Sequence, residues 1–287
     1  MNKSYSKLKT LLFSVSLTLI FVNQFSLASA HSSPKKSEHA EPMDHGHAKK
    51  MSHAKPAKSS SHAKPHWEYS GAHGPQQWSH LSNKFRMCAS GRLQSPFNIH
   101  ADISAELPEL DLDYHAVPLR VINNGHTIQV DQAGAGRLNV GGKSYELLQF
   151  HFHSTSEYTI NGERYPLELH LVHASESGDL AVVGVMFKEG AENAELANIW
   201  AHMPSRKGTN QVAGRLADVN NLLPRDKRYY RFMGSLTTPP CSEGVNWHMM
   251  QTPITVSAAQ IARFKAIYPM NARPLQHKNA RLVVMGK

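Results

Sequence analysis

The sequence predicts a mainly β protein, a single domain built on a large, twisted, mostly antiparallel sheet with a few short surface helices. Runs rich in β-branched and aromatic residues alternate with Gly, Pro, Asn and Asp turns. These candidate strands cover residues 119–130, 143–153, 166–174, 179–188 and 244–256. A helical hydrophobic period appears only near 191–202 and after Ser257, in SAAQIARFKAIY. The residues from Trp67 to Lys287 are enough for one well-buried core.

The amino-terminal segment is not part of this core. Residues 1–30 combine three lysines, an apolar run over 11–22 and a small-residue pattern ending at Ala30, the layout of a secretory signal peptide cleaved after Ala30. Asn23 and Gln24 end the run before the roughly 20 apolar residues that a bilayer requires, so a membrane anchor is the weaker interpretation. We therefore expect a periplasmic or secreted protein with no membrane span in its mature form.

Residues 31–66 have a different composition, with seven His, seven Lys, three acidic residues and a direct repeat of SHAKP at 52–56 and 61–65. A segment this polar cannot bury enough apolar area to offset the entropy of ordering it, so we predict a disordered tether. Its histidines suit additional Zn, Cu or Ni ions. The alternative is a solvated spacer in which they bind no metal.

Positive charge is concentrated in these two segments. The whole chain has a formal net charge of +9, whereas the predicted domain over 67–287 holds 21 Lys and Arg against 19 Asp and Glu. No basic patch interleaved with aromatic residues occurs in that domain, which argues against binding of nucleic acid.

The two cysteines, Cys88 and Cys241, are the only ones in the chain. An exported protein meets an oxidising compartment, so an even pair predicts a disulfide. Closing so long a loop stabilises a protein by about 2 to 4 kcal/mol. The alternative is two buried free thiols.

Four histidines fall close together in QFHFHSTSEYTINGERYPLELHLVH. Side chains alternate faces along a strand, so His151 and His153 share one face. The turn signal NGERYP folds the next strand back beside the first, and on that strand Glu168 and His170 share a face while His173 points the other way. We predict that His151, His153 and His170 bind one metal ion and that His173 is a buried, hydrogen-bonded core residue.

Polar neighbours favour the metal interpretation. Gln149 is in register with His151, and Glu168 lies two residues from His170, where acceptors of this kind fix the tautomer and direction of a ligating imidazole. The alternative is a pair of ordinary polar residues on a half-exposed strand. Three neutral imidazoles without a fourth protein ligand are typical of a catalytic zinc with an open position for water, whereas cysteines close a structural zinc site.

Many blocks of the sequence, taken in order, resemble the alpha-class carbonic anhydrases, in particular the exported bacterial members. The resemblance covers nearly all of 67–287 and includes HWEYSG, CASGRLQSPFNI, INNGHTIQV, QFHFH, SEYTING, PLELHLVH, LAVVGVMFK, GSLTTPPCSEGVNW and NARPLQ. It implies the fold of that family and the zinc-dependent reversible hydration of CO2 to bicarbonate and a proton, by attack of a zinc-bound hydroxide. It also implies inhibition by sulfonamides or anions at the zinc, and it favours a homodimer.

The resemblance also implies roles for single residues. The carbonyl group of Asn271 is the implied acceptor for His153. Thr237 resembles the residue whose hydroxyl donates to Glu157 and orients the attacking oxygen. His126 resembles the proton shuttle, because an imidazole with a pKa near 6.5 can take a proton through water and release it to buffer. Without the resemblance, a single His in a turn is an ordinary turn residue.

Further implied positions lie around the site. Thr238 corresponds to the polar side of the substrate pocket, and Cys88 and Cys241 fall where exported members carry their disulfide. The apolar wall where CO2 rests is implied at Val172, Val182, Leu236, Val245 and Trp247. Burial of such residues is also what any β core requires, so this group adds little by itself.

Two further residues resemble family positions, and one residue departs from the family pattern. Tyr69 and Arg273 resemble structural anchors of the amino-terminal and carboxy-terminal segments. Tyr158 follows Glu157 where many members have His. We expect this departure to change stability, or to tune activity modestly, rather than to abolish it.

Two other functions fit part of the pattern. A periplasmic copper–zinc superoxide dismutase also combines an H-x-H pair, one disulfide and, in some members, a His-rich front, but it requires further His or Asp ligands that form no coherent set here. A zinc-binding or adhesion protein with an inactive site is the second alternative. The presence of all three His ligands together with Thr237 and Glu157 argues against it.

Overall fold

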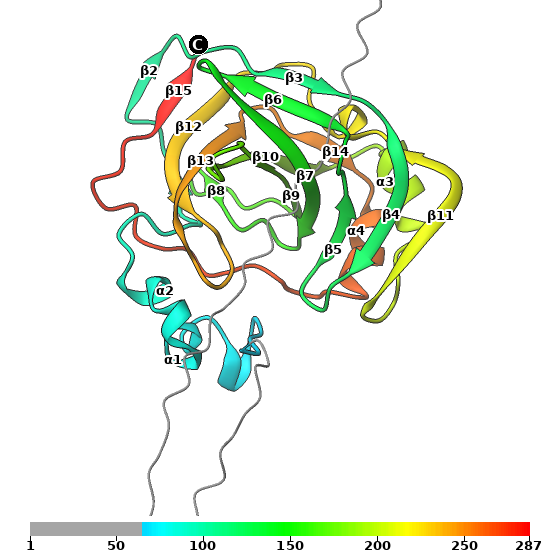
Figure 1. The fold of residues 1–287 in the computed structure, drawn as a ribbon, viewed down its shortest axis with the longest axis horizontal. Coiled ribbons are helices and arrows are strands. Elements are labelled where there is room, and N and C mark those ends of the chain that lie inside the picture. Colours follow the sequence, from blue (N-terminus) through cyan, green and yellow to red (C-terminus); the bar gives the residue numbers. More distant parts are fainter. Residues whose placement is uncertain (1–64) are drawn as a thin grey trace, which may run out of the picture. The chain divides into compact units, whose positions relative to one another are not determined.

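Residues 65–287 are described in this computed structural model, and they are built mainly from short strands (Figure 1). The predicted signal peptide and nearly all of the predicted tether lie outside the described residues. The strands are β1 (Asn98–Ile99), β2 (Ile103–Ala105), β3 (Asp111–Tyr114), β4 (Val117–Asn123), β5 (Ile128–Asp131), β6 (Gly136–Val140), β7 (Lys143–His153), β8 (Thr159–Ile160), β9 (Leu167–Ala174), β10 (Leu180–Glu189), β11 (Gly208–Ala217), β12 (Tyr229–Ser235), β13 (Glu243–Met250), β14 (Ile254–Val256) and β15 (Val284–Gly286).

One large sheet organises this part of the chain. Its main path runs β11-β4-β5-β7-β9-β10-β13-β12-β15-β2, and β1 pairs with β8 in a separate small sheet. Most neighbouring pairs are antiparallel, while β10-β13, β10-β14 and β15-β2 are parallel. The prediction of a mainly β, mostly antiparallel fold is therefore confirmed, and the sheet is mixed at the side that follows β10.

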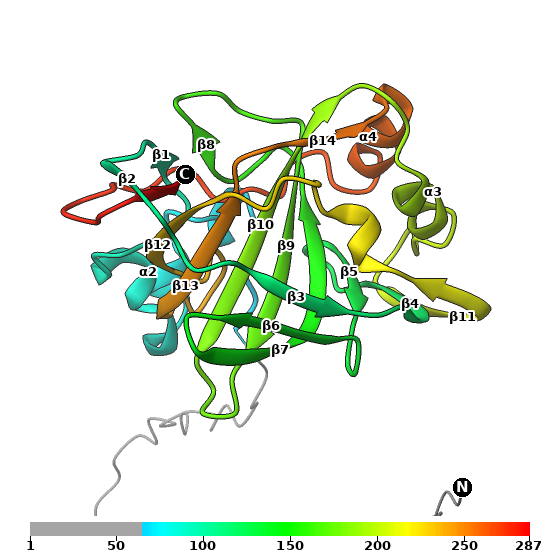
Figure 2. The ribbon, with the colours of Figure 1, turned by 90° about the horizontal axis from the view of Figure 1, so that it is seen from above.

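The helices are short and lie outside the sheet. They are α1 (Trp78–Leu81), α2 (Met87–Ser90), α3 (Ala194–Trp200) and α4 (Ala258–Lys265), with 3-10 turns η1 (Gly71–His73), η2 (Asn83–Phe85) and η3 (Val219–Leu222). Figure 2 shows α3 and α4 together beside the sheet. Among these described helices, none is long and apolar enough to cross a membrane.

Both helices expected from the sequence are confirmed, and the second begins at a complete capping box. The Ser257 hydroxyl accepts from the Gln260 backbone N–H, and the Gln260 side chain accepts from the Ser257 backbone N–H, so two backbone donors of the first turn are satisfied. The turns from η1 to α2 were not predicted. They contain three or four residues each, too few for a helical period to be recognised.

A bulge in β7 decides which face of this strand meets the main core. The pairing of β7 with β9 shifts between Leu147 and Gln149, and Leu148 at the bulge is 43% exposed. Before the bulge Leu147 faces the core, and after it Phe150 and Phe152 do so, all three being almost completely buried in one hydrophobic cluster. The residues that alternate with the two phenylalanines therefore face the opposite side of the sheet.

The predicted disulfide between Cys88 and Cys241 is present, with the two Cα atoms 5.0 Å apart. Both cysteines are buried in a small cluster with Trp78 and Phe85, apart from the main core. The bond ties the amino-terminal helical turns to the loop before β13.

Arg273 anchors the carboxy-terminal segment against the same cluster, as its resemblance implied. Its guanidinium donates to Gln94 Oε1, the Ser95 carbonyl and the Cys88 carbonyl at 2.9, 2.7 and 2.8 Å. It also lies over the Trp78 ring, 5.5 Å from the ring centroid. The charge is buried, and these three acceptors replace the water that it gives up.

Two buried histidines on the core side of the sheet differ in their hydrogen bonding. His173 has partners at both ring nitrogens, the Tyr114 hydroxyl at 2.6 Å and the Ala181 carbonyl at 3.3 Å, as predicted for a core histidine. His248 on β13 is also fully buried, but neither of its ring nitrogens has a hydrogen-bond partner within the described residues. Burial, together with the charge of Arg231, lowers the pKa of His248 to about 3.

We expect His248→Leu to make the protein more resistant to acid. An unfolded His has a pKa near 6.5, so below that pH the unfolded chain takes up a proton that the folded chain does not, and stability is lost as the pH falls toward 3. At pH 5 this loss is about 2 kcal/mol, at about 1.36 kcal/mol per pH unit. Denaturant titrations at pH 8 and pH 5 measure how much unfolding free energy is lost between the two pH values. The variant should lose less than the wild type, by the amount just given. An equal pH dependence in both proteins contradicts the assignment.

Candidate metal centre

Two adjacent strands supply the three predicted ligands. His151 and His153 lie near the end of β7, and His170 lies on β9 directly opposite His151 in the antiparallel register. His153 is paired in the same way with Glu168. Because Phe150 and Phe152 hold the other face of β7 in the core, all three imidazoles are on the face opposite to that core. The alternation predicted from the sequence is confirmed.

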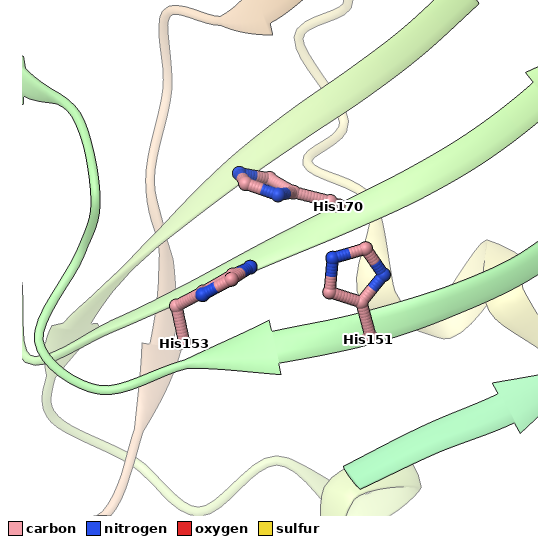
Figure 3. Close-up of side chains that lie close together, drawn as sticks. All are labelled: His151, His153 and His170. Atoms are coloured by element: carbon pink, nitrogen blue, oxygen red, sulfur yellow. The ribbon is translucent and has the colours of Figure 1, made fainter. Parts of the chain in front are cut away.

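The three imidazole rings converge on one point (Figure 3). Their centroids are 5.1 Å apart for His151 and His153, 5.3 Å for His151 and His170, and 4.6 Å for His153 and His170. One nitrogen from each ring lies within 4.8 Å of the corresponding nitrogens of the other two. His153 is fully buried and His170 is 2% exposed, while His151 forms the more open side.

Each of these rings is oriented by an oxygen acceptor on its other nitrogen. The donor and acceptor pairs are His151 Nδ1 with Gln149 Oε1 at 2.9 Å, His153 Nδ1 with the Asn271 carbonyl at 2.8 Å, and His170 Nε2 with Glu168 Oε1 at 2.8 Å. A ring nitrogen that donates its proton leaves a lone pair on the other nitrogen. The lone pairs of two Nε2 atoms and one Nδ1 atom therefore face the common point.

The protonation state and the donor set both fit a divalent ion. Burial lowers the pKa of all three histidines, that of His170 to about 3, so the rings are neutral at neutral pH, the form that binds metal. His153 Nε2 is buried and has no hydrogen-bond partner among the described residues. A bound cation would satisfy this nitrogen. Three neutral imidazoles with an open fourth position suit Zn²⁺ in a catalytic role.

Glu157 is buried beside the converging rings. Its Oε1 accepts the Arg273 backbone N–H at 2.9 Å, and its Oε2 lies 3.5 Å from His153 Nε2 and 3.9 Å from His170 Nδ1. Burial raises the pKa of the Glu157 carboxyl, and His153, the Arg273 N–H and the Thr237 hydroxyl act in the opposite direction. Burial thus favours the protonated form of Glu157, whereas these neighbours favour the carboxylate, the form that accepts a hydroxyl proton.

Glu168 and Tyr158 support His170 from behind. Glu168 Oε2 accepts the backbone N–H groups of Glu157 and Tyr158 at 2.6 and 3.0 Å. Burial raises the pKa of Glu168 to about 7, although these two hydrogen bonds act in the opposite direction. Tyr158 is fully buried and donates its hydroxyl to Ser95 Oγ at 2.6 Å. Tyr158 thus holds the segment that positions Glu168, and the expected effect of this departure on stability or activity stays a prediction.

Asn271 does more than the sequence indicated. Besides its carbonyl, its side-chain amide donates to the His126 and Phe152 carbonyls at 3.1 and 3.0 Å, and its Oδ1 accepts the Ser154 N–H at 2.7 Å. The buried amide thereby joins the end of β7 to the turn that carries His126. No local sequence pattern marks this role, because the residues that Asn271 joins lie more than 100 positions away in the chain.

His126 lies against the amino-terminal segment. Its ring stacks on Trp67 with centroids 3.7 Å apart and an interplanar angle of 6°, and its Nε2 is 2.9 Å from the Trp67 carbonyl oxygen. Burial lowers the pKa of His126. The Asn124 side chain accepts the His126 backbone N–H and fixes the turn. The shuttle role of His126 stays a prediction.

The residues implied for the apolar wall lie together beside the ligands. The ring of Trp247 is 4.9 Å from that of His170, and Thr238 is partly buried in the neighbouring loop. One hydrophobic cluster contains Val182, Val245 and Trp247, with Val172 and Leu236 packed against it. Their role in binding substrate stays a prediction.

The fold and this site define a known family. The chain belongs to the eukaryotic-type carbonic anhydrases, whose family model matches residues 73–286. The predicted family, fold class and enzyme type are therefore confirmed.

Similar proteins include bacterial carbonic anhydrases. That of Klebsiella pneumoniae is 45% identical over 76% of this chain and 90% of its own length. The alpha-carbonic anhydrase of Photobacterium profundum has a solved structure that is 48% identical, with a TM-score of 0.72, and the match covers 76% of this chain and 100% of that chain. The alpha-carbonic anhydrase of Thermovibrio ammonificans, solved with the inhibitor sulfanilamide, is 43% identical with a TM-score of 0.74 over 77% of this chain and 100% of that chain.

We expect Glu168→Gln to weaken zinc binding by about 10- to 100-fold, the range typical of changes to residues that orient metal ligands. An amide cannot accept from His170 through one atom and from two backbone N–H groups through the other, because one of those atoms is itself a donor. Competition with a zinc chelator measures the dissociation constant. Glu163→Gln, an exposed change in the same hairpin, is the control, and equal affinity in both variants contradicts the role given to Glu168.

Proposed function

We propose that this protein catalyses the reversible hydration of CO2 to bicarbonate and a proton, with one Zn²⁺ held by His151, His153 and His170. The observation that carries the proposal is the convergence of three neutral imidazole lone pairs, one nitrogen from each ring lying within 4.8 Å of the others. The family and the bacterial relatives named as carbonic anhydrases support the reaction type.

Zn²⁺ at this position would supply Lewis-acid chemistry that makes water a nucleophile near neutral pH. The residues of the chain do the rest. The Thr237 hydroxyl, which lies near enough to lower the pKa of Glu157, would donate to that carboxylate. Its oxygen would then be left as an acceptor that orients the attacking group. The Arg273 backbone N–H holds the Glu157 carboxylate in place.

The apolar residues next to His170 give CO2 a place to bind. Val182, Val245 and Trp247 are each 2% exposed or less, and CO2 has no charge or strong hydrogen-bonding group that would need polar partners. A wall of this kind favours the apolar substrate over charged bicarbonate, which helps the product to leave.

His126 would export the proton that each hydration event releases. In the structure its Nε2 contacts the Trp67 carbonyl, so the shuttle must give up this hydrogen bond, or pass the proton through Nδ1, in each cycle. The lowered pKa of His126 favours the neutral imidazole, which is the form that can accept the proton.

We also propose that the protein acts outside the cytoplasm and that sulfonamides bind at its zinc. The signal-peptide pattern and the disulfide between Cys88 and Cys241 support the first proposal, because disulfides persist in oxidising compartments. The solved complex of the Thermovibrio ammonificans enzyme with sulfanilamide supports the second.

The test of the main proposal is a pH-indicator assay of CO2 hydration before and after chelation, with zinc content measured on the same sample. We expect His170→Ala to lose zinc and to lower kcat/KM by at least about 10³-fold, the equivalent of the several kcal/mol that a metal contributes. His115→Ala, a change to an exposed histidine, is the control. Full activity after zinc removal, or in His170→Ala, overturns the proposal.

We expect His126→Ala to slow turnover by about 10-fold or more at low buffer concentration, because proton export then depends on water and buffer alone. Added imidazole should restore the rate, and kcat/KM should change little because the zinc ligands are intact. Stopped-flow measurements over a range of buffer concentrations test both points. A loss that imidazole does not restore would assign the shuttle to another group.

A further inference from the structure

A second group of potential metal ligands lies where the described chain begins. The described residues contain two groups of at least three His, Cys, Asp or Glu side chains close enough to hold an ion, the triad above and the set His66, Glu68 and His73. One ligand atom from each member of this second set lies within 4.8 Å of the others. All three residues are exposed, and none takes part in the site on β7 and β9.

The geometry of the set is that of a partly assembled site. His66 Nε2 is 3.0 Å from Glu68 Oε1, and the His66 and His73 rings lie edge to face with centroids 5.3 Å apart. The Glu68 N–H donates to the His73 carbonyl at 2.9 Å, across a turn that Gly71 enters with a φ of +68°. Glycine tolerates this conformation without strain, so the turn brings His73 back beside the other two residues.

The backbone that carries these side chains is fixed to the domain. Trp67 lies between His66 and Glu68 in sequence. Its ring packs edge to face on the rings of Tyr69 and Trp78, at centroid distances of 5.3 and 5.2 Å. The Trp78 indole N–H donates to the Glu68 carbonyl at 2.9 Å. The ligands therefore start from a rigid support although their tips are in solvent, which reduces the entropy lost on binding.

We propose that His66, Glu68 and His73 bind a second divalent transition-metal ion, Zn²⁺, Ni²⁺ or Cu²⁺. Two imidazoles and one carboxylate form a donor set that these ions favour. Ligand atoms about 2.0 to 2.2 Å from an ion lie roughly 3.3 Å apart, so the exposed side chains need to close by no more than about 1.5 Å. Water completes the coordination.

The composition of the preceding segment fits this proposal. His66 is the last of seven histidines in residues 31–66, and the SHAKP repeat ends directly before it. Histidines that precede the proposed site in sequence would bind ions weakly and so raise the local concentration of ions next to it.

An ion at this site would also act on His126. Trp67 stands between two of the ligands, its ring stacks on His126, and its carbonyl contacts His126 Nε2 at 2.9 Å. Clamping residues 66–68 would hold Trp67, and with it His126, in the observed position and so slow proton export. This consequence rests on the proposed function, whereas binding of the ion does not.

Titration of the zinc-loaded full chain with Ni²⁺ tests the site. His73→Ala is compared with His80→Ala, a change to an exposed histidine of the same segment, and all other histidines stay in place in both variants. We expect calorimetry to detect one additional tight site in the wild type and in His80→Ala that is missing in His73→Ala. If His73→Ala still binds this ion, we expect its affinity to be at least 10-fold lower. Equal binding by the two variants overturns the proposal.

A second readout locates the ion without any variant. Paramagnetic Cu²⁺ should broaden the indole N–H signals of Trp67 and Trp78 at lower concentrations than those of Trp200 and Trp247, which lie in other parts of the domain. Broadening of all four signals together indicates ions that are not held at this site and overturns the proposal.

The effect on His126 is tested by CO2 hydration at low buffer concentration with and without Ni²⁺. We expect Ni²⁺ to slow the wild type and His80→Ala several-fold, to leave His73→Ala unchanged, and to lose its effect at high buffer concentration. If Ni²⁺ binds but does not slow CO2 hydration, the metal site stands and its coupling to His126 is overturned. Absence of CO2 hydration without Ni²⁺ contradicts the proposed function instead, and the binding measurements are unaffected by it.

Discussion

The antiparallel register of β7 and β9 is the constraint on which the site depends. It places His151 opposite His170 and leaves His153 one step away on the same face. A slip of one residue would turn the imidazoles into the core and the phenylalanines out of it. Burial of Phe150 and Phe152 therefore stabilises the register and the ligand geometry together, since each such ring is worth about 1.5 to 3 kcal/mol when it is removed from water.

The carboxy-terminal segment completes what the two strands begin. Through Asn271 it supplies the acceptor for His153 and a link between the end of β7 and the turn of His126. Through Arg273 it supplies a donor to Glu157 and a buried cation that ties this segment to the disulfide cluster around Cys88. The site is therefore assembled from segments far apart in the chain, and hydrogen bonds that water cannot reach hold these segments together.

Burial determines the electrostatics of the centre. It keeps the three imidazoles neutral and so available as lone-pair donors. It also raises the free energy of ionising the two nearby carboxyl groups, which accept hydrogen bonds from backbone N–H groups instead of water. The proposed second site has the opposite character, with exposed ligands on a buried aromatic support. Trp67 lies next to both His126 and these ligands, so it connects the start of the described chain with the proposed proton shuttle.

Local patterns in the sequence determined the alternation of strands, the two longer helices, and the face shared by His151, His153 and His170, because these depend on side-chain periods of two or 3.6 residues. The sequence also predicted the pairing of Cys88 with Cys241, since the chain contains no other cysteine. Only the tertiary structure decided the bulge at Leu148, the amide bridge of Asn271, and the return of His73 beside His66. These features depend on contacts between distant segments or on the conformation of a single turn, and neither leaves a periodic signal in the sequence.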